Sequence, residues 1–189
     1  GIPGLRGVAE IRDAVTGRIL RSFAGHRDIL SDAELAPPDE SLLATAGFDR
    51  SIKLWNVADG TLVRSIDVHN AAVHDLAWNP SGAVLASASA DETVKLWRRS
   101  DGVRLDTLSQ PQGEVLSVAF TPDGEHVVAA GRDRLIHLWR LVSLAEPAIN
   151  PAVQARFAHE AAIVALAGSA DGRRIVTAAE DGSQIGRAH

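Results

Sequence analysis

Histidine, a hydroxyl residue and aspartate occur together along this chain in combinations that could support nucleophilic catalysis. Three complete sets are present, namely His26, Thr45 and Asp49; His69, Ser87 and Asp91; and His159, Thr177 and Asp181. In a catalytic triad the hydroxyl attacks a carbonyl carbon, the imidazole takes the hydroxyl proton and the carboxylate orients the imidazole. The residue types alone are therefore compatible with a hydrolase, and their spacing must decide.

The spacing indicates architecture rather than catalysis. Trp55, Trp97 and Trp139 recur every 42 residues, and an aspartate stands six residues before each of them, at Asp49, Asp91 and Asp133. A catalytic constellation is needed once, whereas this one recurs and is incomplete in places. Aspartate accepts hydrogen bonds from turn N–H groups and an imidazole, and a buried indole N–H needs an acceptor. We therefore interpret the sets as repeated structural hydrogen-bond networks.

Each 42-residue unit has a pattern that predicts four short strands. Val73, Leu76 and Trp78 have spacings of three and then two, which is expected of a strand with a bulge after its first residue. The turn "NPSG" and the run "AVLASAS" follow, and then the aspartate turn, "TVKLW" and a second hairpin at "SDG". No segment predicts a helix, so the expected fold class is all-β.

A four-stranded sheet of this size cannot bury both of its faces alone, so the units must stack on one another. Three of the units also have a histidine near their start, and three have a tryptophan near their end. The first full unit begins with the pair Gly25-His26, and later units keep only the histidine, at His69 and His159. The tryptophan near the end of a unit is followed by asparagine or arginine, giving "WN" or "WR". In these features the chain resembles the WD-repeat family. The resemblance implies a β-propeller of four-stranded antiparallel blades, here an incomplete ring.

The units divide residues 1–184 into a partial WD-repeat propeller. We expect the end of a blade at 8–24, blades at 25–68, 69–110 and 111–158, and the start of a blade at 159–184. The 111–158 unit has an extended outer loop. We expect residues 185–189, "IGRAH", to be a non-native tail, because Arg187 stands where the next tryptophan belongs and the segment resembles a translated sequencing-adapter oligonucleotide. Because the chain begins with Gly1, we expect a longer natural protein.

The resemblance also assigns roles inside each blade. In the family a histidine, a serine or threonine, the turn aspartate and the tryptophan form one hydrogen-bonded chain. The matching residues are His26, Thr45, Asp49 and Trp55; His69, Ser87, Asp91 and Trp97; Asp133 and Trp139; and His159, Thr177 and Asp181. The third set is expected to be incomplete, because Pro111 and Ala129 occupy its histidine and serine positions.

Composition argues against several classes of function. The net charge of −5 and the pI near 5.8 disfavour a nucleic-acid or anionic-membrane binder, which needs a basic surface. Without cysteine there is no thiolate metal site. The remaining histidines, His74, His126 and His137, show no ligand spacing, and no phosphate or dinucleotide loop occurs. We predict no intrinsic catalysis, no cofactor and no metal. The sequence does not fix the compartment, although the cytoplasm is favoured.

The resemblance implies a protein–protein interaction scaffold that presents its top face and rim to protein or peptide partners. In the family the contact positions lie just before the turn aspartate and just after the first apolar residue of the opening strand. Here they are Phe48, Arg132, His74, Leu116, Ser31 and Glu180. The alternative is a docking or regulatory propeller of a larger multidomain enzyme, with its kinase, protease-like or redox domain elsewhere. The alanine- and arginine-rich composition suits a bacterial source.

Overall fold

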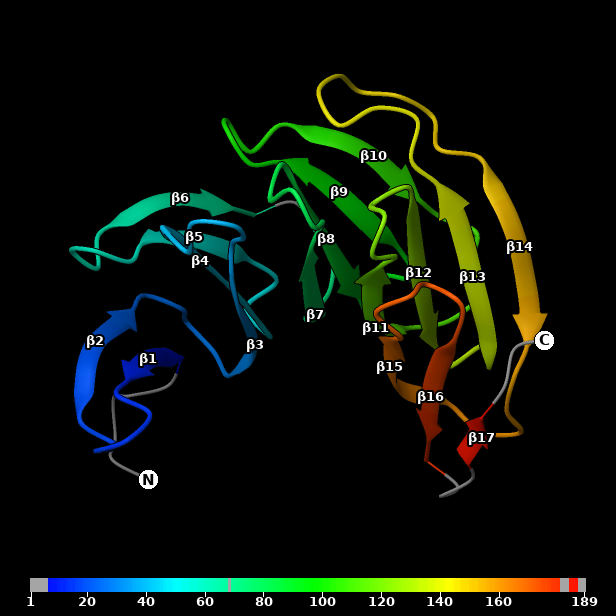
Figure 1. The fold of residues 1–189 in the computed structure, drawn as a ribbon, viewed down its shortest axis with the longest axis horizontal. Coiled ribbons are helices and arrows are strands. Elements are labelled where there is room, and N and C mark those ends of the chain that lie inside the picture. Colours follow the sequence, from blue (N-terminus) through cyan, green and yellow to red (C-terminus); the bar gives the residue numbers. More distant parts are fainter. Residues whose placement is uncertain (1–6, 68, 181–183, 187–189) are drawn as a thin grey trace.

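The computed structural model describes residues 7–67, 69–180 and 184–186, and these residues form strands joined by turns. The described residues contain no helix, and therefore none long and apolar enough to cross a bilayer. Consecutive strands pair antiparallel in five sheets that follow one another along an arc, and the arc does not close into a ring (Figure 1). The predicted all-β class with four-stranded antiparallel sheets is confirmed.

The sheets are numbered I to V in chain order. Sheet I contains β1 (Val8–Arg12) and β2 (Ile19–Ala24). Sheet II contains β3 (Leu30–Leu35), β4 (Leu42–Gly47), β5 (Ile52–Asn56) and β6 (Leu62–Ile66). Sheet III contains β7 (Val73–Trp78), β8 (Val84–Ser89), β9 (Val94–Arg98) and β10 (Arg104–Leu108).

Sheet IV contains β11 (Val115–Phe120), β12 (His126–Gly131), β13 (Leu135–Arg140) and β14 (Ala152–Phe157). Sheet V contains β15 (Ile163–Gly168), β16 (Ile175–Ala179) and β17 (Gln184–Gly186). In sheets II to V the first strand is the innermost one, toward the centre of the arc, and β3, β7, β11 and β15 contact one another in that order (Figure 1).

The predicted bulge is present at the start of each innermost strand. The register of pairing shifts between Val73 and Asp75 in β7 and between Val115 and Ser117 in β11. The same shift occurs in β3 and β15. The bulge leaves His74 unpaired in β7 and Leu116 unpaired in β11.

Each innermost strand is also an edge strand of its sheet, and side chains of the preceding sheet accept from backbone N–H groups on this edge. Asp32 Oδ2 accepts from the backbone N–H of Leu76 at 2.9 Å, and Asp75 Oδ2 accepts from the backbone N–H of Val118 at 2.8 Å. Ser117 Oγ takes the same position one sheet later and accepts from the N–H of Leu166 at 3.3 Å. Neighbouring sheets are therefore joined by hydrogen bonds as well as by apolar packing.

The hydrophobic core lies between successive sheets. Trp97 packs in a cluster shared by sheets II and III, and Trp139 packs in a cluster shared by sheets III and IV. Trp55 packs on Phe23 of sheet I, with their ring centroids 5.9 Å apart. Each tryptophan therefore fills the space toward the sheet before its own, which explains why the tryptophan recurs once per unit.

The extended connection between β13 and β14, residues 141–151, is bonded to sheet III. The backbone N–H of Ala148 donates to the carbonyl of Leu105 at 3.1 Å. Asn150 is buried and donates from its backbone N and its Nδ2 to Asp106 Oδ2, both at 2.8 Å. Within the expected non-native tail at 185–189, Ile185 and Gly186 pair with Thr177 and Val176 of β16. Residues 187–189 lie outside the described residues.

Candidate functional site

The first set of sequence-predicted residues lies together in sheet II. The Nδ1 atom of His26 lies 3.0 Å from both carboxylate oxygens of Asp49. Its Nε2 atom lies 2.8 Å from Thr45 Oγ1, and that oxygen accepts the Trp55 indole N–H at 2.8 Å. A Cβ atom on Gly25 would come within 2.9 Å of the Trp55 ring, so this approach requires glycine before the histidine.

The second set has the same geometry in sheet III. His69 Nδ1 lies 2.8 Å from Asp91 Oδ2, and its Nε2 lies 2.7 Å from Ser87 Oγ. The Trp97 indole donates to the same Ser87 oxygen at 2.8 Å. Lys95 extends this network, because its Nζ donates to Asp91 Oδ2 at 3.0 Å and the residue is only 5% exposed.

The burial of these networks decides what they can do chemically. Ser87 is 0% exposed and Thr45 is 1% exposed, so neither hydroxyl is open to a substrate from solvent. Burial lowers the pKa of His69 and alone would raise that of Asp91, but hydrogen bonds from His69, Thr93 and the N–H of Asn70 hold the Asp91 pKa below its ordinary value. A neutral imidazole and an ionised carboxylate then hold the turn in place.

The third set forms a different network in sheet IV. The Asp133 carboxylate lies 2.7 Å from Nε2 of His137, and the Trp139 indole donates to Gln110 Oε1 at 2.8 Å. The His137 ring also stacks on Trp139, at 5.5 Å between centroids and 13° between planes. Sequence reasoning missed His137 and Gln110. The available signal was that His137 stands four residues after its aspartate, where sheets II and III have Lys53 and Lys95.

The fourth set is described in part. His159 Nε2 lies 2.7 Å from Thr177 Oγ1, and both residues are buried in sheet V. The remaining member, Asp181, lies outside the described residues.

The expected partner-contact residues lie on one face. We define the top face as the face that carries the turns between the second and third strands of sheets II to IV, residues 48–51, 90–93 and 132–134. The connections that enter each innermost strand lie on the same face. Phe48 is 47% exposed there, and its ring meets His74 edge-on at 5.8 Å.

From His74, a series of charged side chains extends over the top face of sheets IV and V. His74 Nε2 lies 3.7 Å from a carboxylate oxygen of Glu114, and the atom is buried without a hydrogen-bond partner among the described residues. Arg132 Nε donates to the same Glu114 oxygen at 2.9 Å, and its Nη1 lies 3.9 Å from Glu180. The structure thus brings Phe48, His74, Arg132 and Glu180 into one row.

Two other expected contact residues do not join this row. The Ser31 hydroxyl donates to the backbone carbonyl of Val73 at 2.5 Å, which links sheets II and III. Leu116 is half-buried. Glu114, which connects His74 to Arg132, was not predicted. It stands directly before the first apolar residue of β11, and a single sequence gives no reason to select that position.

The repeats match a known family model. The model described as "WD domain, G-beta repeat" matches residues 17–56, 60–98, 102–140 and 152–183, which is most of the chain. The chain belongs to the WD-repeat family. The match also fits the arc of four-stranded sheets, because a propeller is built from such sheets around a centre.

Among solved structures, this WD-repeat chain is similar to a chain in "Crystal Structure of Mitotic Checkpoint Complex", with a TM-score of 0.84 and 23% identity. The similarity covers 94% of this chain and 55% of that one, and shows the β-propeller fold. "WD repeat and SOCS box-containing protein 1" of Mus musculus is 29% identical over 75 residues, 39% of this chain and 18% of that protein.

"Polycomb group protein FIE1" of Oryza sativa subsp. japonica is 35% identical over 60 residues, 32% of this chain and 13% of that protein. The WD-repeat chain therefore spans less than a fifth of the length of either curated relative over the matched region. These matches establish the repeat and its fold.

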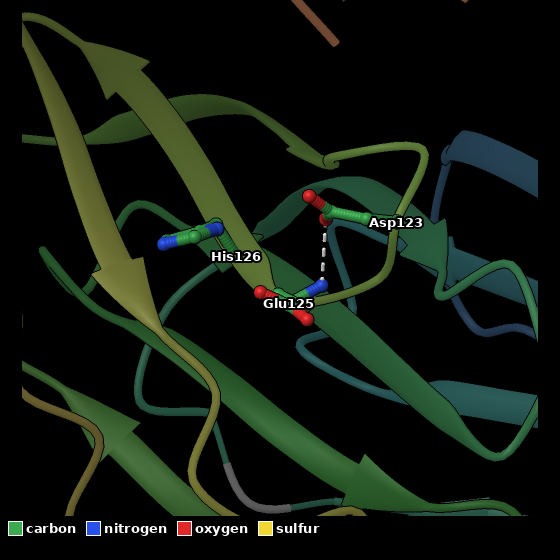
Figure 2. Close-up of side chains that lie close together, drawn as sticks. All are labelled: Asp123, Glu125 and His126. Atoms are coloured by element: carbon green, nitrogen blue, oxygen red, sulfur yellow. Dashed lines mark hydrogen bonds between the residues drawn. The ribbon is translucent and has the colours of Figure 1, made fainter. Parts of the chain in front are cut away.

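One cluster on the opposite face offers metal-ligating atoms. Asp123, Glu125 and His126 each have one such atom, all within 4.8 Å of one another (Figure 2). Asp123 Oδ1 already accepts from the Thr121 hydroxyl at 2.5 Å and from the N–H of Glu125 at 2.9 Å. Those bonds close the turn between β11 and β12 and account for the aspartate. Asp123 and Glu125 are both exposed, and we assign no function to the cluster.

Proposed function

We propose that this WD-repeat chain is a protein-interaction scaffold whose top face binds a protein or peptide partner. The observation that carries the proposal is the row formed by Phe48, His74, Glu114, Arg132 and Glu180. Binding hot spots favour an aromatic ring and an arginine, each held in place by its surroundings. Phe48 and Arg132 supply both. The Phe48 ring contacts His74 of the next sheet, and Arg132 donates to Glu114 of its own sheet.

The same proposal includes the absence of intrinsic catalysis. The hydroxyl groups of Thr45 and Ser87 are buried and accept indole hydrogen bonds, so the residues that resemble a triad support the fold. Because both hydroxyl groups are buried, a substrate in solution does not reach them directly. Function then depends on surface recognition.

The proposal can be tested with peptides selected from a displayed random library against the immobilised chain. We expect Phe48→Ser and Arg132→Gln each to weaken binding of the selected peptides at least tenfold. Ile149→Ser is the matched control, because Ile149 is an apolar residue that is 89% exposed in the 141–151 connection, away from the top face. Equal binding by wild type and Phe48→Ser, or loss with Ile149→Ser alone, would contradict the proposal.

A further inference from the structure

A polar pocket of about 610 Å³ lies at the top face of sheet II, beside the turn that carries Phe48. Three cationic side chains line it. Arg27 comes from the connection between β2 and β3, Arg50 from the turn after β4, and Lys53 from β5. Ser65 and Asp67, at the end of β6 and just beyond it, line the other side.

The three cations have no carboxylate partner among the described residues. No ion pair joins Arg27, Arg50 or Lys53 to an aspartate or glutamate there, whereas Arg98, Arg99 and Arg132 each have one. The guanidinium groups of Arg27 and Arg50 also make no hydrogen bond within this part of the chain. An exposed guanidinium group that has no acceptor within the protein can bind an external anion.

Two carboxylates, Asp49 and Asp67, also line the pocket, so its three cations exceed its carboxylates by one. Asp49 is held by His26, by the backbone N–H of Arg27 and by Ser51. Burial alone would raise its pKa, but these hydrogen bonds lower it to about 2. Among the described residues, Asp67 accepts from the Ser65 hydroxyl alone, at 3.2 Å. The pocket therefore keeps an excess of positive charge although the whole chain is acidic.

A comparison of two equivalent lysines supports this interpretation. Lys53 and Lys95 each stand four residues after the turn aspartate and occupy the same position in β5 and β9. Lys95 turns inward and donates to Asp91. Lys53 turns outward, donates to Ser65 Oγ at 2.8 Å and lines the pocket. An ammonium group has three donors, so Lys53 keeps two for a ligand.

We propose that this pocket binds the phosphoryl group of a phosphorylated side chain on the partner. The inference rests on the proposed function, because it places the partner on the same face. A phosphoryl group is close to a dianion at neutral pH and offers three acceptor oxygens, which suits two arginine forks and one ammonium group better than a single carboxylate does. Phe48, two residues before Arg50, is then placed to contact an apolar residue beside the modified one.

The test is calorimetric titration of wild type with a short alanine- and leucine-based peptide. The peptide is prepared with a central phosphoserine, glutamate or unmodified serine, and inorganic phosphate is the fourth probe. All titrations use one fixed ionic strength, because salt screens exposed charges. We expect the phosphoserine peptide to bind at least tenfold more tightly than each of the other three probes. We also expect it to shift the backbone amide resonances of Arg27, Arg50 and Lys53 in wild type.

Two variants and a matched control locate the site. Lys53→Gln and Arg50→Gln should each weaken binding of the phosphoserine peptide at least tenfold. Arg134→Gln should leave it unchanged. Arg134 occupies the same turn position in sheet IV, with a φ of 67° against 69° for Arg50, but does not line this pocket. Thermal unfolding of each variant checks that it folds.

Several results would overturn the proposal. They are equal binding of the three peptide forms, equal binding of inorganic phosphate and the phosphoserine peptide, or equal loss in Arg134→Gln and Lys53→Gln. Amide shifts in wild type that avoid Arg27, Arg50 and Lys53 would also overturn it, independently of how any variant folds. Binding of library-selected peptides that still depends on Phe48 would then preserve the scaffold function and reject only the phosphoryl pocket.

Discussion

At the scale of single residues, Asp91 accepts hydrogen bonds from four residues of sheet III and its entering connection. It accepts from His69, from Thr93, from Lys95 and from the backbone N–H of Asn70. Lys95 is almost fully buried, and a buried charge without a partner is strongly destabilising. The aspartate therefore stabilises the sheet through the donors that it satisfies.

Replacing this carboxylate should be costly. We expect Asp91→Ala to lower the free energy of unfolding by about 3 kcal/mol, because it removes the acceptor of His69 and Lys95 together. Urea denaturation measures the change. Glu125→Ala, which removes an exposed carboxylate on the opposite face, should stay within about 0.5 kcal/mol of wild type. A similar loss in both variants would contradict the structural role of Asp91.

Gln110 should stabilise sheet IV in place of the missing serine. We expect Gln110→Leu to lower the free energy of unfolding by about 1–3 kcal/mol. The reason is that the indole N–H of the buried Trp139 then lacks its acceptor. Chemical denaturation followed by tryptophan fluorescence measures this loss. Gln112→Leu is the neighbouring control, since Gln112 is exposed and only its backbone N–H bonds to Asp133. No difference between the two variants would refute the assignment.

Part of this residue-scale organisation could be predicted from the sequence. The sets of sheets II and III could be aligned because each member recurs at the repeat interval. His137 and Gln110 could not be found in this way, because each occurs in one unit only. Glu114 connects two side chains that are distant in sequence, and only the packing of adjacent sheets brings them together.

At the scale of strands and sheets, the bulged innermost strands of successive sheets are connected by hydrogen bonds. The spacing of Val73, Leu76 and Trp78 was enough to predict the bulge, because a bulge changes the period of the apolar residues. The spacing contains no information on which side chain accepts the exposed N–H groups. Asp32, Asp75 and Ser117 do so in this structure, and two of these three are acids that lie close together.

The acidic residues that connect sheets II and III should make the free energy of unfolding depend on pH. Burial, with a contribution from Asp32, raises the pKa of Asp75 from 3.8 to about 6, although hydrogen bonds from Val118 and Ser117 oppose the shift. Burial, Asp32 and Asp75 likewise raise the pKa of the neighbouring Glu34 to about 7. A carboxyl group whose pKa is higher in the folded state contributes stability below its unfolded pKa and loses it as the pH rises.

Asp75→Asn should remove the titration of this residue and keep an acceptor for the backbone. We expect the free energy of unfolding of the variant, relative to wild type, to increase as the pH rises from about 4 to about 6. The comparison cancels most other titrating groups. Asp123→Asn should not show this increase, because hydrogen bonds from Thr121 and Glu125 lower the Asp123 pKa. Urea denaturation across this pH range that shows a constant difference for Asp75→Asn would contradict the account.

Packing between sheets II and III should depend on Trp78. The residue is 8% exposed, and its indole donates to the carbonyl of Glu34 in the preceding sheet at 3.3 Å. We expect Trp78→Ala to lower the free energy of unfolding by about 3–5 kcal/mol, because it leaves a cavity between these sheets. Phe48→Ala, at a half-exposed ring, should cost less than about 1 kcal/mol. Calorimetry that finds a small loss for Trp78→Ala would refute the packing.

At the scale of the whole molecule, successive sheets present the top-face row as a fixed surface. Phe48, His74, Arg132 and Glu180 come from four consecutive sheets, so their relative positions follow from how the sheets stack (Figure 1). A surface that is already ordered loses little conformational entropy when a partner binds. The recurring interval of 42 residues predicted the stacking, whereas the charges and apolar groups on the face differ from unit to unit and had to be found in three dimensions.

The measurement that tests this account most directly is amide hydrogen exchange of the chain, with and without a library-selected peptide. We predict slower exchange in the top-face segments 25–29, 48–51, 69–72, 111–114 and 132–134. The turns on the opposite face, 79–83 and 121–125, should be unchanged. Slower exchange confined to the opposite-face turns, or to the 141–151 connection, would contradict the top-face scaffold.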